Sequence, residues 1–376
     1  MHKYPAKFFP ELPRWIIEKY SKRVDWVLDP FAGSGTVNVE SMLLGRPSIA
    51  LDIDPFARFL IKAKTTKANT GRLTNAARVI RERLGQFGKN EPTLPNFPYA
   101  DHWFAPHILH ELARIKHVVQ SVRMDTATRN FILVVFSSII RTVSNADNHC
   151  TRTVVRKRLN KPVRGGLTIQ LFLAQLDKQI RQMDALPGDV SKVIVPDNAD
   201  ARKIRCRQDV RLAVTSPPYL NAVDYPRTHQ LEMYWLGIAN GSLRDLKREH
   251  IGTEVVYSNE YKIKHLTGDS CADRVIERVF ATDPRRAYIA WLYLQDMGHT
   301  FEAVYEALVE GSHYVVVVGD NMIRGTPFES WKYFIPMAES VGFTTTLHFE
   351  SEIINHYIKV PRKERITSDH ILVFQK

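Results

Sequence analysis

Two short stretches of the sequence hold side chains that could bind a ligand and align it for reaction. The first, Ser216, Pro217, Pro218 and Tyr219, follows an apolar segment over 210–214 that predicts a buried strand. The prolines stiffen the backbone and remove two N–H donors, so the serine hydroxyl and a rigid carbonyl make two acceptors suited to an –NH₂ group. The ring of Tyr219 offers a flat face on which a heterocycle can stack. We therefore expect a binding site at the carboxyl end of this strand, where open α/β sheets place ligands.

The second stretch, Asp29 to Thr36, reads Asp-Pro-Phe-Ala-Gly-Ser-Gly-Thr. It lies between a strand predicted over 24–28 and a helix predicted over 37–44. Strand, glycine turn and helix open a nucleotide-binding α/β unit. No lysine follows the second glycine and the G-x-G-x-x-G spacing is missing, so the turn is neither a phosphate-binding P-loop nor a dinucleotide fingerprint. An acid beside such a turn suits a ligand with a cationic amino acid part and no phosphates.

Together the two stretches closely resemble the signatures of the S-adenosylmethionine-dependent DNA amino-methyltransferases, which methylate N4 of cytosine or N6 of adenine. The resemblance spans most of 1–70 and 190–376, interrupted by 71–189. It implies an α/β fold, a Rossmann-like seven-stranded class I methyltransferase sheet with a helical insertion. It also implies S-adenosyl-L-methionine as cofactor and duplex DNA as partner, as in restriction-modification, and leaves open a cognate restriction endonuclease.

The resemblance implies a role for each cofactor-binding position. The loop before the first helix would cap the methionine end of the cofactor with His2, Tyr4 and Phe8. The glycine turn would contribute Asp29, Phe31, Gly33, Gly35 and Thr36. After a strand predicted over 47–51, Asp52 would bind the ribose hydroxyls, and the alternate, Asp54, is expected to cap the helix that begins at Pro55. Asp200 would face the adenine amino group, with Asn198 as second choice.

The resemblance also implies how the base would react. Hydrogen bonds from the target amino group to Ser216 Oγ and the Pro217 carbonyl would direct its lone pair at the methyl group, while Tyr219 stacks on the flipped base. No catalytic cysteine is required. In this family a serine at the first motif position goes most often with cytosine N4, so we expect a cytosine-N4 enzyme, with adenine N6 as the alternative. The glycine turn precedes Ser-Pro-Pro-Tyr, the reverse of the commoner cytosine-N4 order, which leaves the target-recognition region open.

The composition favours a nucleic-acid partner. Among 376 residues, 52 Lys and Arg against 40 Asp and Glu give a net charge of +12, and binding to a polyanion releases counterions. Residues 71–189 show helical patterns and the most basic run, so we expect an insertion that grips DNA, although a charge run is often a solvated face. The irregular, basic segment 238–285 is the second candidate for the region that recognises the DNA sequence. Predicted nucleic-acid contacts are Arg141, Asn145, Arg152, Arg156, Lys157, Arg158, Asn221, Tyr225 and Arg227.

The remaining features exclude several classes. Three scattered cysteines without a C-x-x-C pair argue against structural zinc or a disulfide framework, and we expect no metal. No signal peptide or bilayer-spanning apolar run is visible, so a cytoplasmic protein is expected. Two rivals stay open: an RNA methyltransferase with the same fold and motifs, and a non-catalytic DNA-binding subunit that keeps the fold.

Overall fold

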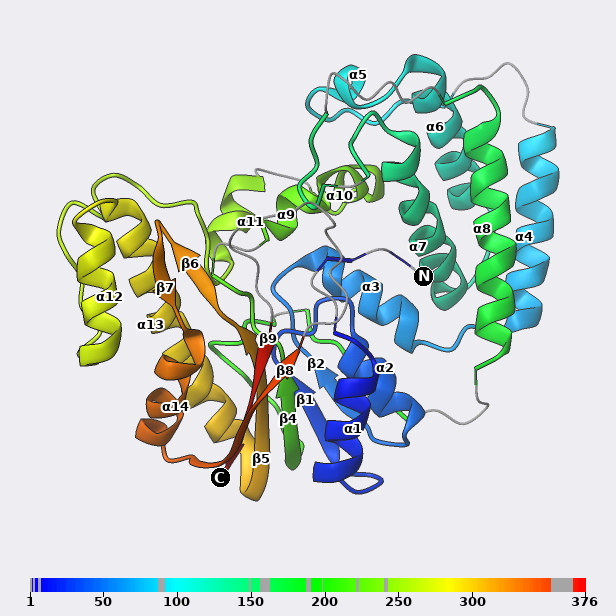
Figure 1. Cartoon of the computed structure of the whole chain (residues 1–376). Helices are drawn as coiled ribbons and strands as arrows, with labels where there is room; N and C mark the ends of the chain where they lie inside the picture. The colour runs from blue at the N-terminus through cyan, green and yellow to red at the C-terminus, as the bar shows by residue number, and fades with distance from the viewer. Residues whose placement is uncertain are drawn as a thin grey trace. The chain divides into compact units, whose positions relative to one another are not determined.

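The computed structural model describes residues 2, 4–5, 8–86, 92–148, 150–155, 163–186, 191–197, 199–220, 223–239, 243–352 and 368–376. The chain divides into two compact units, which Figure 1 shows. The α/β unit comprises Pro5–Ile61, Val190–Pro226 and Arg244–Lys376. The helical unit comprises Met1–Tyr4, Lys62–Asp189 and Arg227–Leu243.

A seven-stranded sheet forms the centre of the α/β unit among the described residues, in the order β3-β2-β1-β4-β5-β9-β8. Its strands are β1 (Trp26–Asp29), β2 (Ser48–Ala50), β3 (Val193–Ile194), β4 (Val210–Thr215), β5 (Leu308–Gly319), β8 (Thr344–Glu352) and β9 (Ser368–Gln375). The first five are parallel, whereas β9 is antiparallel to both of its neighbours. The predicted fold class, a Rossmann-like class I methyltransferase sheet, is therefore confirmed.

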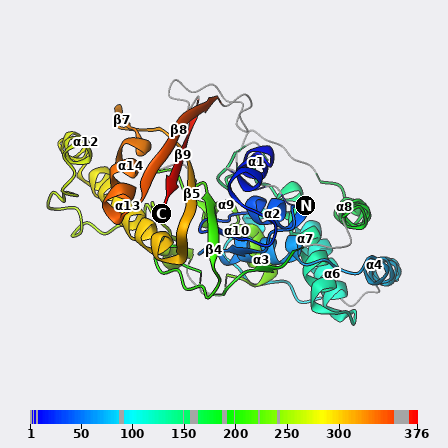
Figure 2. The same ribbon diagram turned by 90° about the horizontal axis from the view of Figure 1, so that it is seen from below.

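Successive side chains of a strand point to opposite faces of the sheet, so the apolar residues of the central strands lie on both faces. On one face, Val27, Val214 and Val315 pack with α1 (Glu11–Tyr20) and α2 (Thr36–Leu43). On the other, Leu28, Ala213 and Tyr314 belong to a core shared with α12 (Ser270–Phe280), α13 (Pro284–Ala307) and α14 (Ser330–Val341). Figure 2 shows these two helical layers on opposite sides of the strands. With both faces covered, functional side chains of the parallel strands are confined to the strand ends.

Part of the expected organisation was wrong. The segment predicted to be irregular, 238–285, contains α11 (Leu243–Glu249) as well as α12. Ala272, Ile276 and Val279 recur at helical spacing and are buried in the sheet's core, and Cys271, Val275 and Phe280 pack against the same core, so α12 is an amphipathic helix. The hairpin of β6 (Asn321–Ile323) and β7 (Thr326–Phe328) was also missed, as was α14.

The helical unit is built around four long helices that were expected from their apolar periodicity. They are α4 (Thr70–Gly85), α6 (Pro106–Ser121), α7 (Thr126–Val143) and α8 (Leu167–Asp184), and they pack on one another. Leu231 and Trp235 of α10 (Gln230–Leu236) complete the same core. No helix in the described ranges has the length and apolar character needed to cross a bilayer.

Candidate active site

A hydrogen bond joins the two predicted motifs at the carboxyl ends of neighbouring strands. Thr215 Oγ1, at the end of β4, donates to Asp29 Oδ1, at the end of β1, over 2.8 Å. The backbone N–H of Phe31 donates to the same oxygen over 3.1 Å. Because β1 and β4 are adjacent in the sheet, the glycine turn and the Ser-Pro-Pro-Tyr segment start side by side.

Asp29 is an acid that is costly to ionise in the absence of a cation. The residue is 2% exposed, and burial raises the pKa of its carboxyl to about 7. The hydrogen bonds from Thr215 and Phe31 oppose this increase, whereas the charge of Asp52 adds to it. A cationic group bound beside Asp29 would favour the carboxylate form. The site is therefore suited to an ammonium group.

The turn after β1 has a backbone conformation that favours glycine. The φ angles are 52° at Gly33 and 78° at Gly35. A Cβ at Gly35 would lie 3.0 Å from Ile61 Cγ1, so a side chain there would be both strained and crowded. Thr36 begins α2 and is buried, and Phe31 packs against the core. The two glycines leave the backbone open to the close approach of a ligand.

Asp52 and Asp54 follow β2 and are used differently. The two oxygens of Asp52 accept from the N–H of Gly33 at 2.7 Å and from that of Asp54 at 2.8 Å. Asp54 Oδ1 accepts from the N–H of Phe56 at 2.8 Å, which is the expected cap of α3 (Pro55–Thr65). Burial raises the pKa of both carboxyls to about 6. Asp54 is 1% exposed whereas Asp52 is partly exposed, so Asp52 is the more accessible carboxylate.

We expect Asp52→Ala and Asp54→Ala to weaken different properties. If Asp52 binds the ribose, as the resemblance implies, its removal takes an acceptor from the ligand and an anchor from Gly33. The Kd for S-adenosylhomocysteine, the cofactor without its methyl group, should then rise about tenfold or more. Without the Asp54 cap the free energy of unfolding should fall by about 0.5–2 kcal/mol, with a smaller change in this Kd. Calorimetric titration and urea unfolding measure the two effects. Unchanged affinity in Asp52→Ala together with a loss in Asp54→Ala would transfer the ligand role to Asp54.

Tyr219 is held by a residue that is distant in the sequence. Its hydroxyl donates to Asp369 Oδ1, on β9, over 2.9 Å, and its ring packs against the core. Burial raises the pKa of Tyr219 well above its usual value, the charge of Asp369 adds to this, and a hydrogen bond with Ser216 opposes it. The phenol therefore stays neutral and keeps its proton for Asp369. Pro217 is buried, while Ser216 and Pro218 are partly exposed.

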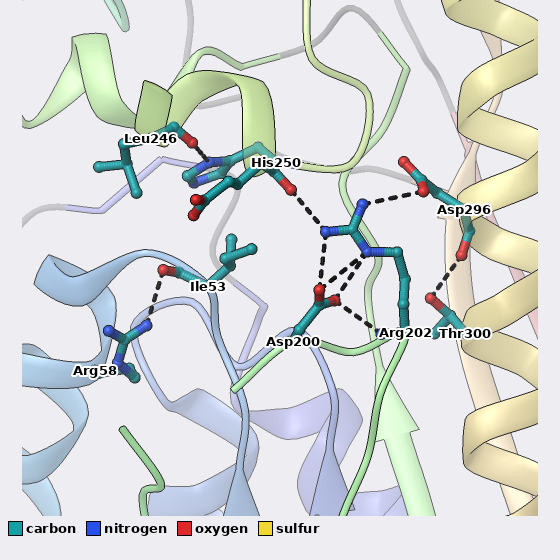
Figure 3. Close-up of polar contacts among 9 residues, drawn as sticks. Ile53, Arg58, Asp200, Arg202, Leu246, His250, Asp296 and Thr300 are labelled. Carbon is teal, nitrogen blue, oxygen red and sulfur yellow. Dashed lines mark hydrogen bonds and ion pairs between the residues drawn. The ribbon is translucent and has the colours of Figure 1, made fainter. Parts of the chain in front are cut away.

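Asp200 is locked to a neighbouring arginine, as Figure 3 shows. Arg202 Nε and Nη2 donate to its two oxygens, each over 2.9 Å. The same guanidinium donates to Asp296 of α13 and to the Glu249 carbonyl at the end of α11, both over 3.0 Å. Burial raises the pKa of Asp200, but the hydrogen bonds from Arg202 outweigh it and the pKa is lowered. The network anchors the end of α11 to the loop that follows β3.

Two predicted residues of the α/β unit have neighbours that were not expected. Tyr225 begins α9 (Tyr225–Thr228), and its pKa is raised by burial and by the charges of Asp52 and Asp54. The residue predicted to contact nucleic acid thus lies near the acids that follow β2. Phe8, predicted to lie over the cofactor, packs against the apolar cluster between α1 and the sheet.

The other predicted residues that the structure describes belong to the helical unit. Tyr4 stacks on His229 with ring centroids 4.9 Å apart, and His2 lies edge-on to the same ring at 6.0 Å. Arg141 organises a loop, because its guanidinium donates to backbone carbonyls of Asp147, Cys150, Thr151 and Arg152.

The remaining residues predicted to contact nucleic acid are Asn145, Arg152 and Arg227 among the described residues. Asn145 donates through its side chain to the carbonyl of His102 and through its backbone to that of Trp103. Arg152 is exposed and Arg227 is partly exposed. The predicted residues that lie outside the described residues are Arg156, Lys157, Arg158, Asn198 and Asn221.

Sequence reasoning gave no role to several residues that shape this site. Asp369 lies 150 positions from Tyr219, and no local pattern links the two. Arg202 ends the Asp-Ala-Arg stretch that begins at Asp200, and the sequence predicted no role for it. His250, which follows α11, lies close enough to Asp52 for their charges to interact. For Asp369 and His250 the sequence held no usable signal, because strand order and the packing of α11 bring them to the site.

Comparison with known proteins shows similarity to DNA methylases over part of the chain. Residues 2–62 match the family model of the DNA methylases that act on N6 and N4. The chain is 26% identical over 259 residues to the type II methyltransferase M.MvaI of Kocuria varians, covering 63% of this chain. It is 26% identical over 294 residues to the type II methyltransferase M.BsoBI of Geobacillus stearothermophilus, covering 70% of this chain. The matched regions span 57% of the length of each relative.

Among solved structures, a SAM-dependent methyltransferase of Methanosarcina mazei covers 100% of this chain, and this chain covers 99% of it. The TM-score is 0.33 and the sequence identity 10%, so this likeness carries no weight in assigning a function. The similarities that bear on function are those to the family model and to the curated relatives. The chain is thus similar to DNA methylases over residues 2–62 and to type II methyltransferases over 63–70% of its length.

Proposed function

We propose that the chain is a site-specific DNA methyltransferase that transfers a methyl group from S-adenosylmethionine to the exocyclic N4 of a cytosine flipped out of duplex DNA. The observation that carries the proposal is the hydrogen bond from Thr215 to Asp29. This bond joins the end of β1, where Asp29 is suited to an ammonium group, to the end of β4, where Ser-Pro-Pro-Tyr is suited to an amino nitrogen. Donor and acceptor of the methyl group would then meet at one edge of one sheet.

The residues at this edge fit the methyl donor, which supplies an electrophilic methyl group on a positively charged sulfur. Asp29 would bind its ammonium group, because a cation would offset the cost of ionising this buried carboxyl. The oxygens of Asp52 are oriented by two backbone N–H groups and could accept from ribose hydroxyls. Asp200 is our candidate for the adenine amino group, because a carboxylate oxygen accepts more than one hydrogen bond.

The Ser-Pro-Pro-Tyr segment would orient the target base. An exocyclic amino nitrogen is a poor nucleophile, because its lone pair is delocalised into the ring. Acceptance of its two hydrogens by Ser216 Oγ and the Pro217 carbonyl would direct that lone pair at the methyl group, and alignment would supply much of the rate. The hydroxyl of Tyr219 is anchored to Asp369, so its ring would stack on the base without reorganising.

The choice of cytosine N4 depends on Ser216 at the first motif position, and adenine N6 is the alternative because both bases present a similar amino edge. Duplex DNA as substrate is supported by the DNA methylase family model, the type II relatives and the net charge of +12. Those relatives also favour a setting in restriction-modification, with a cognate endonuclease as partner. The rivals are an RNA methyltransferase and a non-catalytic DNA-binding subunit.

Nucleoside mass spectrometry tests the proposal. The protein is incubated with isotopically labelled S-adenosylmethionine and amplified bacterial genomic DNA, which contains most short sequences and no methylated cytosine or adenine. Total RNA is treated in parallel, and Asp29→Asn serves as the matched negative control. We expect label in N4-methylcytosine of the DNA alone.

Label in N6-methyladenine would retain the mechanism and overturn the choice of base. Label restricted to RNA would favour the first rival, whereas cofactor binding without transfer to either nucleic acid would favour the second. Nucleoside mass spectrometry, together with a calorimetric titration of the cofactor, therefore decides between them.

A further inference from the structure

His250 presents a buried nitrogen that the proposed reaction does not yet use. The residue follows α11, and its Nδ1 is 2.7 Å from the carbonyl oxygen of Leu246. A carbonyl only accepts, so Nδ1 carries the hydrogen, and in the neutral ring Nε2 is left as an acceptor. Nε2 is buried without a hydrogen-bond partner among the described residues. Such an atom is costly to leave unsatisfied, which points to a missing donor.

An arginine holds the backbone next to His250, and another holds the loop that carries Asp52; Figure 3 shows both arginines. Arg202 binds the carbonyl of the preceding residue, Glu249, over 3.0 Å and is itself held by Asp200 and Asp296. Opposite, Arg58 of α3 donates to the carbonyls of Asp52 and Ile53 at 2.7 and 2.8 Å. Both segments are thus anchored independently of any ligand.

The groups around Nε2 limit which kind of ligand can supply the missing hydrogen-bond donor. Burial lowers the pKa of His250, although the charges of Asp52, Asp224 and Glu249 oppose this, so the ring is neutral near pH 7. Asp52, close enough to interact with His250 electrostatically, is also an acceptor. A group that satisfies two nearby acceptors must bring two hydrogen-bond donors. A vicinal diol such as that of a ribose does so.

We propose that His250 Nε2 accepts a hydrogen bond from one ribose hydroxyl of the cofactor, while Asp52 accepts from the other. The assignment depends on the proposed function, since it takes the bound nucleoside to be that of S-adenosylmethionine. It gives a role in cofactor binding to the segment around α11, which was the second candidate for target recognition.

Binding of S-adenosylhomocysteine, followed by calorimetry, tests the assignment without catalysis. His250→Phe keeps a ring of similar size but lacks the acceptor, and we expect its Kd to rise about tenfold, the effect of one hydrogen bond. His250→Gln can place an amide oxygen near the position of Nε2 and should recover part of the affinity. Thermal unfolding of both variants checks that they are folded.

Ligand analogues separate a direct contact from a structural effect. The wild type and His250→Phe are titrated with the 2′-deoxy and 3′-deoxy forms of S-adenosylhomocysteine. If His250 binds one hydroxyl, removal of that hydroxyl weakens binding to the wild type and has little further effect on the variant. Additive losses with both analogues would overturn the assignment. So would non-additivity found only with an analogue that lacks the adenine amino group, because the acceptor would then serve the base.

Different results would contradict the proposed function and the assignment of His250. A wild-type protein that binds no S-adenosylhomocysteine would overturn the proposed function and this assignment together. Tight binding by the wild type with unchanged binding by His250→Phe would overturn this assignment alone.

Discussion

Tyr219→Ala is expected to lower kcat/KM for DNA methylation by about a hundredfold or more, while the Kd for S-adenosylhomocysteine changes little. The substitution removes the stacking surface, which is worth about 1–3 kcal/mol per base, and frees the target base from its aligned position. Single-turnover methylation and calorimetric titration measure the two quantities. Thermal unfolding should accompany them, because the ring of Tyr219 also packs against the core.

Tyr219→Phe is the matched control for this prediction. It keeps the ring and removes only the hydroxyl that donates to Asp369. We expect a loss of about tenfold or less, since one hydrogen bond that orients the ring is lost while stacking is retained. Equal losses of methylation and cofactor binding in Tyr219→Ala would instead show that Tyr219 maintains the fold of the site.

Asp29→Asn is expected to raise the Kd for S-adenosylmethionine by about a hundredfold or more, because removal of one partner from a buried ion pair costs about 3–5 kcal/mol. The substitution keeps the shape of the side chain, and the amide oxygen can still accept from Thr215, as Asp29 does. A Kd within about threefold of the wild-type value would show that Asp29 does not bind the ammonium group.

The same variant should also change how the affinity for S-adenosylmethionine depends on pH. The pKa of Asp29 in the ligand-free protein is about 7, so its carboxyl is increasingly protonated below that pH. A cationic ligand binds the ionised form better, so the affinity of the wild type should rise with pH up to about 7 and then level off. Asp29→Asn should lose most of this dependence, although Asp52, with a pKa of about 6, still titrates at lower pH.

The stability of the ligand-free protein should show the opposite trend. Burial raises the pKa of Asp29 from 3.8 to about 7, so the folded state binds a proton more tightly than the unfolded state. The free energy of unfolding should therefore fall as pH rises from about 4 to about 7, and this share of the change should be absent in Asp29→Asn. Urea unfolding at several pH values compares the two proteins.

Local patterns in the sequence determined the sheet and the motifs at its edge. The apolar run before Ser216 and the strand before Asp29 were recognised because a strand covered on both faces has few polar positions. The positive φ angles at Gly33 and Gly35 match a turn that could be read from composition. The cap at Asp54 was likewise predictable, because capping involves residues adjacent in the chain.

The tertiary structure alone decided which distant side chains complete the site. Asp369 reaches Tyr219 only because β9 inserts beside β5 in the strand order. His250 approaches Asp52 because α11 is tied through Arg202 to the loop after β3. Such contacts depend on how elements far apart in the chain pack together, and no local periodicity or turn chemistry encodes that arrangement.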